Sequence, residues 1–238
     1  MELSAIWVYL ASQPLLWLAL TVSVYWLAQQ LYAATHRFAL FNPVLVSITT
    51  IVGLLLATHT DYDQYFDGAQ FIHFLLGPAT VALSVPLVGQ LPTLKRNFVP
   101  ISIALLVGSL TGILSTVALC RLLGIDGHML LSLLPRSITT PIAMGVSDQI
   151  GGSAELTVVF VVITGVLGGA FGTLLLGRLT QSDPIASGFA LGMTSHGIGT
   201  ARAFEYSETA GAFAGLAMGL NGALTAALVP LIVWLLAL

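Results

Sequence analysis

The chain has 238 residues, of which 57% are hydrophobic and only 7% are charged. A mean hydropathy of +0.97 and repeated apolar runs of about 20 residues exclude an ordinary soluble domain and predict an all-α polytopic protein of the lipid bilayer. The formal net charge of −3 gives no indication of a nucleic-acid partner.

The first half of the chain, 1–120, contains four apolar runs that predict helices across the membrane. These runs cover 14–34, 43–59, 71–91 and 98–120. Pro78 and Pro86 lie inside the third run, so we expect that helix to kink or split. The acidic stretch 60–67 begins like a calcium loop. Phe66 and Ile72 occupy the positions of the glycine and the final acid, so we interpret the stretch as a solvated loop.

The second half, 121–238, holds most of the 24 glycines and is expected to carry the functional site. Apolar runs predict spans at 154–177 and 211–237, and less regular apolar segments lie at 129–150 and 184–204. The positive-inside rule assigns Lys95, Arg96 and Arg178 to the cytoplasm, which makes 129–150 a re-entrant hairpin. The chain is then one transmembrane domain of about 6–8 segments, and a broken segment in each half indicates two inverted repeats.

Glycines recur every four residues at two places in this half. They are Gly165 and Gly169, and then Gly211, Gly215 and Gly219. Small residues at this spacing let helix backbones approach closely, so each set predicts a smooth ridge for helix packing.

The stretch PRSITTPIAMGVSDQIGG at 135–152 gathers polar side chains between prolines and glycines. The polar residues of interest are Arg136, Ser137, Thr139, Thr140 and Asp148. An arginine at the centre of a bilayer costs about 2.5–3.5 kcal/mol, so Arg136 is expected to face the protein interior. The prolines free backbone carbonyls for a hydroxyl group or a ligand. The alternative is an Arg136–Asp148 pair that locks a hairpin at the membrane interface.

The stretch TSHGIGTAR at 194–202 lies between apolar segments. Asp183 and Pro184 begin a helix that Gly197 and Gly199 are expected to end, and a second helix follows. Helix ends at such a break expose N–H groups and a positive dipole end, which favour an anion. His196 is able to carry a proton. Alternatively, it is a neutral histidine that donates to a free carbonyl.

Together these stretches predict a site for a small carboxylate between discontinuous helices, because arginine presents paired donors that match a carboxylate. We expect 135–150 and 194–202 to lie in contact. The predicted substrate-binding residues are Arg136, Ser137, Thr139, Thr140, Ser195, Thr200, Arg202 and Asn221. The predicted proton- or ion-coupling residues are Asp148, His196 and Glu205. Two alternatives stay open: Asn221 joins helices, and Arg202 pairs with Glu205 or Glu208 at the surface.

Enzymatic and metal sites have little support. GMTSHG has one residue too many for a nucleophile elbow, and GIGTAR lacks the third glycine of a dinucleotide loop. The histidines and the single cysteine do not have metal-ligand spacing. We therefore expect no enzyme activity, no catalytic residues, no metal and no cofactor.

Four stretches together resemble the LrgB/CidB family of bacterial inner-membrane proteins. They are LLPRSITTPIAMGVSDQIGG, TGVLGGAFG, SHGIGTARAFEYSETAGAFAGLAMGLNG and the late LVP. The resemblance implies a multi-pass inner-membrane protein with an LrgA/CidA-like membrane partner. It also implies one of two functions: antiholin-like control of murein hydrolases and autolysis, or transport of pyruvate, glycolate or glycerate.

The buried arginines and broken helices favour transport, because a lysis regulator does not need them. We expect alternating-access transport of small 2-oxo or 2-hydroxy monocarboxylates, by a homo-oligomer working with the LrgA-like partner. The antiholin-like regulator is the alternative, and in it these residues organise an oligomer.

Overall fold

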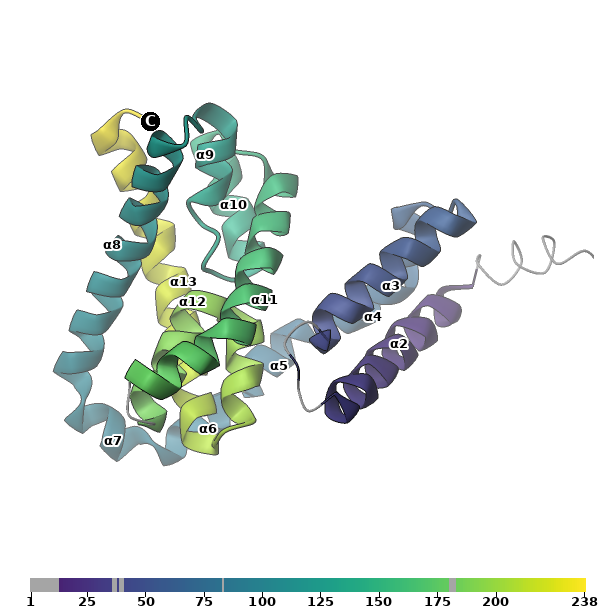
Figure 1. Cartoon of the computed structure of the whole chain (residues 1–238), viewed down its shortest axis with the longest axis horizontal. Helices are drawn as coiled ribbons and strands as arrows, with labels where there is room; N and C mark the ends of the chain where they lie inside the picture. The colour runs from purple at the N-terminus through teal and green to yellow at the C-terminus, as the bar shows by residue number, and fades with distance from the viewer. Residues whose placement is uncertain (1–12, 36–37, 39–40, 83, 180–182) are drawn as a thin grey trace, which may run out of the picture. The chain divides into compact units, whose positions relative to one another are not determined.

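The computed structural model (Figure 1) describes residues 13–35, 38, 41–82, 84–179 and 183–238. Within these ranges every regular element is a helix and none is a strand. Four of the described helices are long and apolar enough to cross a membrane: Pro14–Ala34 (α2), Phe98–Leu122 (α8), the Ala154–Gly172 part of α11 and Glu208–Leu236 (α13). The chain is an all-α polytopic membrane protein, as predicted.

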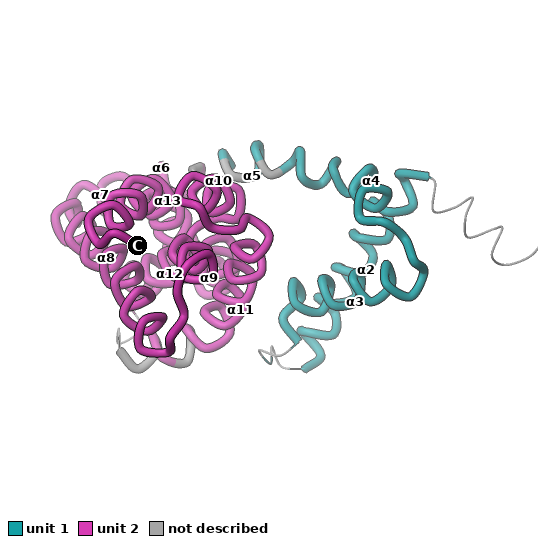
Figure 2. Tube along the Cα trace, turned by 90° about the horizontal axis from the view of Figure 1, so that it is seen from above, with its two compact units in different colours: residues 1–82 teal, residues 83–238 magenta. Residues whose placement is uncertain are grey.

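The helices form two compact units, Met1–Ala82 and Leu83–Leu238, coloured separately in Figure 2. In the first unit α2 packs against α3 (Pro43–Thr58) and α4 (Tyr62–Phe74). Trp17 of α2 is fully buried, and its ring meets Tyr65 edge-on with 5.9 Å between centroids. Gly68 allows the close approach of α4, because a Cβ there would clash with the Pro14 carbonyl oxygen.

The acidic stretch 60–67 is not a loop, so that prediction was wrong. Asp61 is the N-cap of α4, and Asp63 lies in its first turn. Carboxylates near a helix N-terminus interact favourably with the helix dipole, so the same acidic residues that indicate a solvated loop also favour the start of a helix.

The predicted span 71–91 does split. After α4 the chain forms three short helices, Leu76–Ala82 (α5), Ser84–Gly89 (α6) and Leu91–Arg96 (α7). Pro78 and Pro86 are each the third residue of a short helix, within the first turn, where a missing N–H costs no helical hydrogen bond. The prolines therefore mark the points where new helices begin.

The second unit contains the predicted hairpin at 129–150. Its two arms are α9 (Gly127–Leu133) and α10 (Thr140–Ile150), which we call the first hairpin. Its ends lie together, because Nδ1 of His128 is 2.7 Å from the Gly151 carbonyl oxygen. Ser153 then donates its N–H to the Ser132 hydroxyl at 2.8 Å. The segment turns back on itself, which confirms the hairpin.

The segment α12 (Pro184–Phe204) is a second hairpin, whose arms are 184–195 and 197–204. His196 at its tip has φ 40° and ψ −126°, which no helix contains. Gly199 packs so closely on Leu191 that a Cβ would clash with the Leu191 carbonyl oxygen. Residues eight apart in one straight helix would be about 12 Å from each other, so the chain reverses at His196. The predicted break is confirmed, but it lies at His196 rather than at the following glycines.

The two hairpins enter the second unit from opposite ends (Figure 1). The first packs against the C-terminal halves of α8 and α13, in a core that includes Val117, Leu131 and Val229. The second packs against their N-terminal halves, in a core that includes Ile101 and Phe213. Each hairpin is followed by a long helix, α11 (Ala154–Leu179) or α13, and these two run in opposite directions (Figure 1). This is the arrangement of an inverted repeat, but both copies lie in the second unit rather than one in each half of the chain as predicted.

Small residues bring the second hairpin against α13. A Cβ at Gly188 or Gly192 would clash with the backbone of Ala210 or Ala214. Figure 1 shows the resulting close contact of α12 with α13, where the four small residues form one seam.

The two predicted glycine ridges differ in outcome. Gly165 and Gly169 of α11 do receive the tip of the second hairpin, since a Cβ at either would press on His196 or Ile198. The ridge on α13 is confirmed at Gly211, where a Cβ would clash with the Phe204 ring, but not at Gly219, which is exposed and where a Cβ would meet no atom within 4 Å. The α13 seam uses alanines one position earlier, which are also small enough for close packing.

Candidate functional site

Asn221 lies at the point where the two hairpins meet. It is 2% exposed, and its Nδ2 donates to the carbonyl oxygens of Met193 at 2.9 Å and Ser137 at 3.4 Å. Its Oδ1 accepts from the hydroxyls of Ser109 at 2.6 Å and Thr225 at 3.2 Å. Both amide hydrogens and the amide oxygen are thus used. One side chain on α13 therefore connects α8 and both hairpins.

This cluster lies midway along the long helices. Asn221 is the fourteenth of the 29 residues of α13, and Ser109 is the twelfth of the 25 residues of α8. An apolar helix of this length spans the hydrocarbon core, so its midpoint is the depth at which polar groups are most costly and most often functional.

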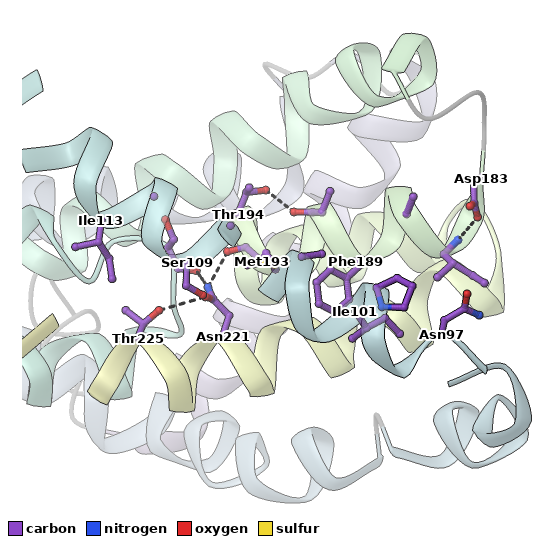
Figure 3. Close-up of a pocket in the computed structure, with 18 of the residues that line it drawn as sticks. Asn97, Ile101, Ser109, Ile113, Asp183, Phe189, Met193, Thr194, Asn221 and Thr225 are labelled. Atoms are coloured by element: carbon purple, nitrogen blue, oxygen red, sulfur yellow. Dashed lines mark hydrogen bonds between the residues drawn. The ribbon is translucent and has the colours of Figure 1, made fainter. Parts of the chain in front are cut away.

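A cavity of about 480 Å³ ends at this cluster (Figure 3). It runs between α8 and the first arm of the second hairpin. Its lining is Asn97, Pro100, Ile101, Ala104, Gly108, Ser109, Gly112, Ile113, Leu134, Ser137, Asp183, Ile185, Ala186, Phe189, Ala190, Met193, Thr194, Asn221 and Thr225.

The two ends of the cavity differ in chemistry, as Figure 3 shows. At one end lie the caps Asn97 and Asp183, where α8 and α12 begin. At the other end are the hydroxyls and amide around Asn221, and between the two ends the walls are apolar, with Ile101 and Phe189 facing the space. The hydroxyl and amide end is the polar end of the cavity.

Arg136 lies directly behind the polar end. Its Nη1 donates to the Thr116 hydroxyl at 3.0 Å, and that hydroxyl donates to the carbonyl oxygen of Gly112, a lining residue, at 2.7 Å. Arg136 is half-buried and is not itself in the lining. Among the described residues no ion pair joins it to Asp148, which is exposed near the end of α10. The guanidinium therefore lies two hydrogen bonds from the cavity wall.

The other predicted residues of the first hairpin lie at its tip. Ser137 lines the cavity, and its carbonyl accepts from Asn221. Thr139 is the N-cap of α10, with no hydrogen bond from its side chain to the helix, and Thr140 is the first helical residue. Both threonines are half-buried.

Two predicted residues at the tip of the second hairpin, Ser195 and His196, face α11 rather than the cavity. Ser195 is fully buried, and a Cβ on Gly168 of α11 would clash with its hydroxyl. Nε2 of His196 lies 3.1 Å from the Val161 carbonyl oxygen. The Thr200 hydroxyl donates to the His196 carbonyl oxygen at 2.8 Å. The histidine thus bonds to a backbone carbonyl, as in the alternative interpretation, but this carbonyl belongs to the continuous helix α11 and not to the break.

Arg202 lies away from the cavity lining, near the end of the second arm. It forms an ion pair with Glu205 and lies over the Tyr206 ring, 5.3 Å from its centroid. This is the arrangement of the surface alternative, in which Arg202 pairs with a neighbouring acid. Asn221 bonds to Ser137 of the segment 135–150 and to Met193, which directly precedes the segment 194–202. The two segments therefore approach the same side chain, and their two arginines do not meet in the cavity lining.

The chain matches the LrgB-like family over residues 21–235. It belongs to that family. It is 40% identical over 218 residues to Uncharacterized protein YxaC of Bacillus subtilis, covering 91% of this chain and 94% of the relative. It is 38% identical to Uncharacterized protein YwbG of the same organism, over 90% and 94%. Antiholin-like protein LrgB of Bacillus cereus is 30% identical over 92% and 95%. No solved structure matches the chain.

Sequence reasoning missed several polar residues of the cavity in this LrgB-like protein. They are Ser109, Thr194 and Thr225, all of which line it. The available signal was a polar side chain near the middle of a long apolar helix, which applies to Ser109 and Thr225. Across the described part of the chain, no three His, Cys, Asp or Glu side chains gather in a way that would hold a metal ion.

Proposed function

We propose that this LrgB-like protein carries small 2-oxo or 2-hydroxy monocarboxylates across the bacterial inner membrane by alternating access. Pyruvate, glycolate and glycerate represent this class. The supporting observation is that two helical hairpins from opposite ends meet at Asn221, at the polar end of a cavity and at mid-depth of the long helices. Substrate sites of secondary transporters are built in this way, from discontinuous helices at the interface of inverted repeats.

The tip of the first hairpin supplies the positive potential for a carboxylate in this proposal. Arg136 lies three residues before Thr139, the N-cap of α10, and the unpaired N–H groups of that helix start nearby. Arg136 would exchange the Thr116 hydroxyl for the carboxylate, since a neutral hydroxyl is the weaker partner. The hydroxyls of Ser137, Thr139 and Thr140 would orient the bound group.

The second hairpin has a supporting role. Ser195 packs its tip against α11, and Thr200 bonds back to the His196 carbonyl oxygen. His196 is the candidate for a coupled proton, because it is the titratable side chain at the tip itself. Asp148 and Glu205 are both exposed, away from the cavity lining. Arg202 would stabilise the end of the second arm through Glu205.

The alternative is an antiholin-like regulator of murein hydrolase activity and autolysis, the role that the name of the Bacillus cereus relative indicates. In that role a cavity with a polar end has no evident use. Both functions would involve an LrgA/CidA-like membrane protein and a homo-oligomer, so transport itself is the property that separates them.

The test is uptake of labelled pyruvate by proteoliposomes that contain the purified protein, with and without the LrgA-like partner. We expect saturable uptake that Arg136→Gln abolishes. Arg121→Gln is the matched control, because Arg121 is exposed in the last turn of α8 and lies outside the cavity lining. Absence of saturable uptake and of pyruvate binding in both preparations would reject transport. Equal loss in both variants would remove Arg136 from the site.

A further inference from the structure

The cavity is much larger than a three-carbon acid. Its volume is about 480 Å³, which corresponds to about 16 water-sized groups at ~30 Å³ each. Its α8 wall extends from Pro100 to Ile113, a distance of about 20 Å at 1.5 Å per residue. A pyruvate molecule at the polar end would leave most of this space to water.

The empty length of the cavity is apolar. From the polar cluster toward Asn97, the walls are formed by apolar side chains of α8 and of the second hairpin, chiefly Ile101, Ala104, Phe189 and Met193. Ile101, Phe189 and Met193 also belong to one buried core cluster, so this wall is part of the packed interior. Water finds few hydrogen-bond partners on such a surface, whereas an aliphatic chain that binds there is favoured because its apolar surface leaves water.

Charge is distributed unevenly along the cavity. Its described lining contains no lysine or arginine, and its one acid, Asp183, is at the end opposite Asn221. A second carboxylate on the ligand would lie on the apolar wall or approach Asp183, and both positions are unfavourable. Beyond the polar end, which has Arg136 behind it, the cavity therefore offers no favourable position for a second anionic group.

We infer that the preferred substrates are monocarboxylates with an aliphatic tail, such as 2-oxo acids of five or more carbons, rather than three-carbon acids or dicarboxylates. This inference rests on the proposed function, because it assigns the carboxylate to the polar end. The tail lies along Ile101, Ala104 and Phe189, toward Asn97.

The test is competition against labelled pyruvate in proteoliposomes, with pyruvate, 2-oxobutanoate, 2-oxopentanoate, 4-methyl-2-oxopentanoate and 2-oxoglutarate as competitors. Each added methylene should tighten binding about four-fold, which corresponds to ~0.8 kcal/mol. The dicarboxylate should not compete at concentrations where 2-oxopentanoate does. If pyruvate uptake is saturable but affinity is constant or falls with chain length, the inference is overturned while the proposed function stands. If no 2-oxo acid binds or is carried, the proposed function fails.

A filling variant separates the cavity from general partitioning of the tail into lipid. Ala104→Leu narrows the apolar wall, so it should remove the gain in affinity from longer tails. Ala118→Leu is the control, because Ala118 is exposed on the same helix and is outside the lining. It should keep the full gain. Retention of the gain in folded Ala104→Leu protein would show that the tail does not bind along this wall.

Discussion

Ser109 donates its hydroxyl hydrogen to the side-chain oxygen of Asn221 across 2.6 Å, midway along α8 and α13. The bond is fully buried, and it holds together two long helices that contact different parts of both hairpins. The nearby serine Ser102 instead bonds within its own helix, to the Phe98 carbonyl oxygen, and is exposed.

This pair gives a prediction about stability. Ser109→Ala should lower the free energy of unfolding by about 0.5–1.5 kcal/mol, because a buried hydrogen bond is lost and the Asn221 oxygen keeps only Thr225 as a donor. Ser102→Ala should change it by less than about 0.5 kcal/mol. Thermal unfolding in one detergent measures both. Equal melting temperatures for the two variants would contradict a structural role of the Ser109–Asn221 bond.

Gly192 and Gly197 lie in the two arms of the same hairpin and should respond oppositely to alanine. A Cβ on Gly192 would clash with the Ala214 backbone, which cannot move aside easily, whereas a Cβ on Gly197 meets nothing within 4 Å. Gly192→Ala should therefore destabilise the protein by about 1–3 kcal/mol or more. Gly197→Ala should be neutral or stabilise it by up to about 1 kcal/mol. Protease resistance and melting temperature report the difference, and a stable Gly192→Ala protein would contradict the seam.

The backbone of His196 leads to an unusual ranking of substitutions. At φ 40° a side chain with a Cβ is strained by about 1–3 kcal/mol. His196→Ala keeps the strain and loses the contact with Val161, whereas His196→Gly loses both. The glycine variant should thus be the more stable of the two by about 0.5–2 kcal/mol. This range already subtracts the cost of the greater conformational entropy of glycine in the unfolded chain.

Ala201 provides the control for this ranking, because it is exposed in the second arm. There, Ala201→Gly should destabilise by about 0.5–1 kcal/mol, the ordinary order in a helix. If His196→Gly is the less stable of the two His196 variants, the left-handed conformation at the tip is disproved.

The two arginines should differ in substrate binding. Arg202→Lys should change pyruvate affinity by less than about five-fold, because an ion pair beside solvent contributes under about 1 kcal/mol and Lys keeps the charge beside Glu205.

Arg136→Lys should weaken pyruvate binding by about 5- to 150-fold, since lysine loses the paired donors that fit a carboxylate, at a cost of about 1–3 kcal/mol. Binding titrations on folded variants compare the two directly. If Arg202→Lys weakens pyruvate binding more than Arg136→Lys does, the anion site lies at the second hairpin instead.

The long helices could be predicted because a run of about 20 apolar residues has few alternatives to spanning a membrane. The reversal inside α12 could not. Its sequence continues without proline, and the glycines at 197 and 199 indicated a break slightly too late. The position of the tip depends on contacts far away in the chain, since His196 is held by Val161 and fits against Gly165. Local preference does not contain that information.

Part of the candidate site could also be predicted from the sequence. Ser137 and Asn221 were found because polar groups at membrane depth need an explanation. Ser109 was missed because one hydroxyl in an apolar helix is common, and only the tertiary contact with Asn221 distinguishes it. The stretches around Arg202 and Arg136 have similar compositions, so the sequence did not distinguish the two arginines. The reversal at His196 carries the second arm back away from the cavity, and there Glu205 is its nearest anionic partner.

The two hairpins also determine whether the number of membrane crossings in the second unit is odd or even. Because both turn back, the described helices that run the full length of the second unit are α8, α11 and α13, and Figure 1 shows them in alternating directions. An odd number of crossings separates Lys95 and Arg96 from the end of α13, while position 178 near the end of α11 returns to the side of Lys95 and Arg96. All three basic positions thus gather at one end, the pattern of a cytoplasmic face. Had only one hairpin turned back, the end of α13 would lie on the same side of the membrane as Lys95 and Arg96. With two, we expect a reporter fused there to face the compartment opposite to them.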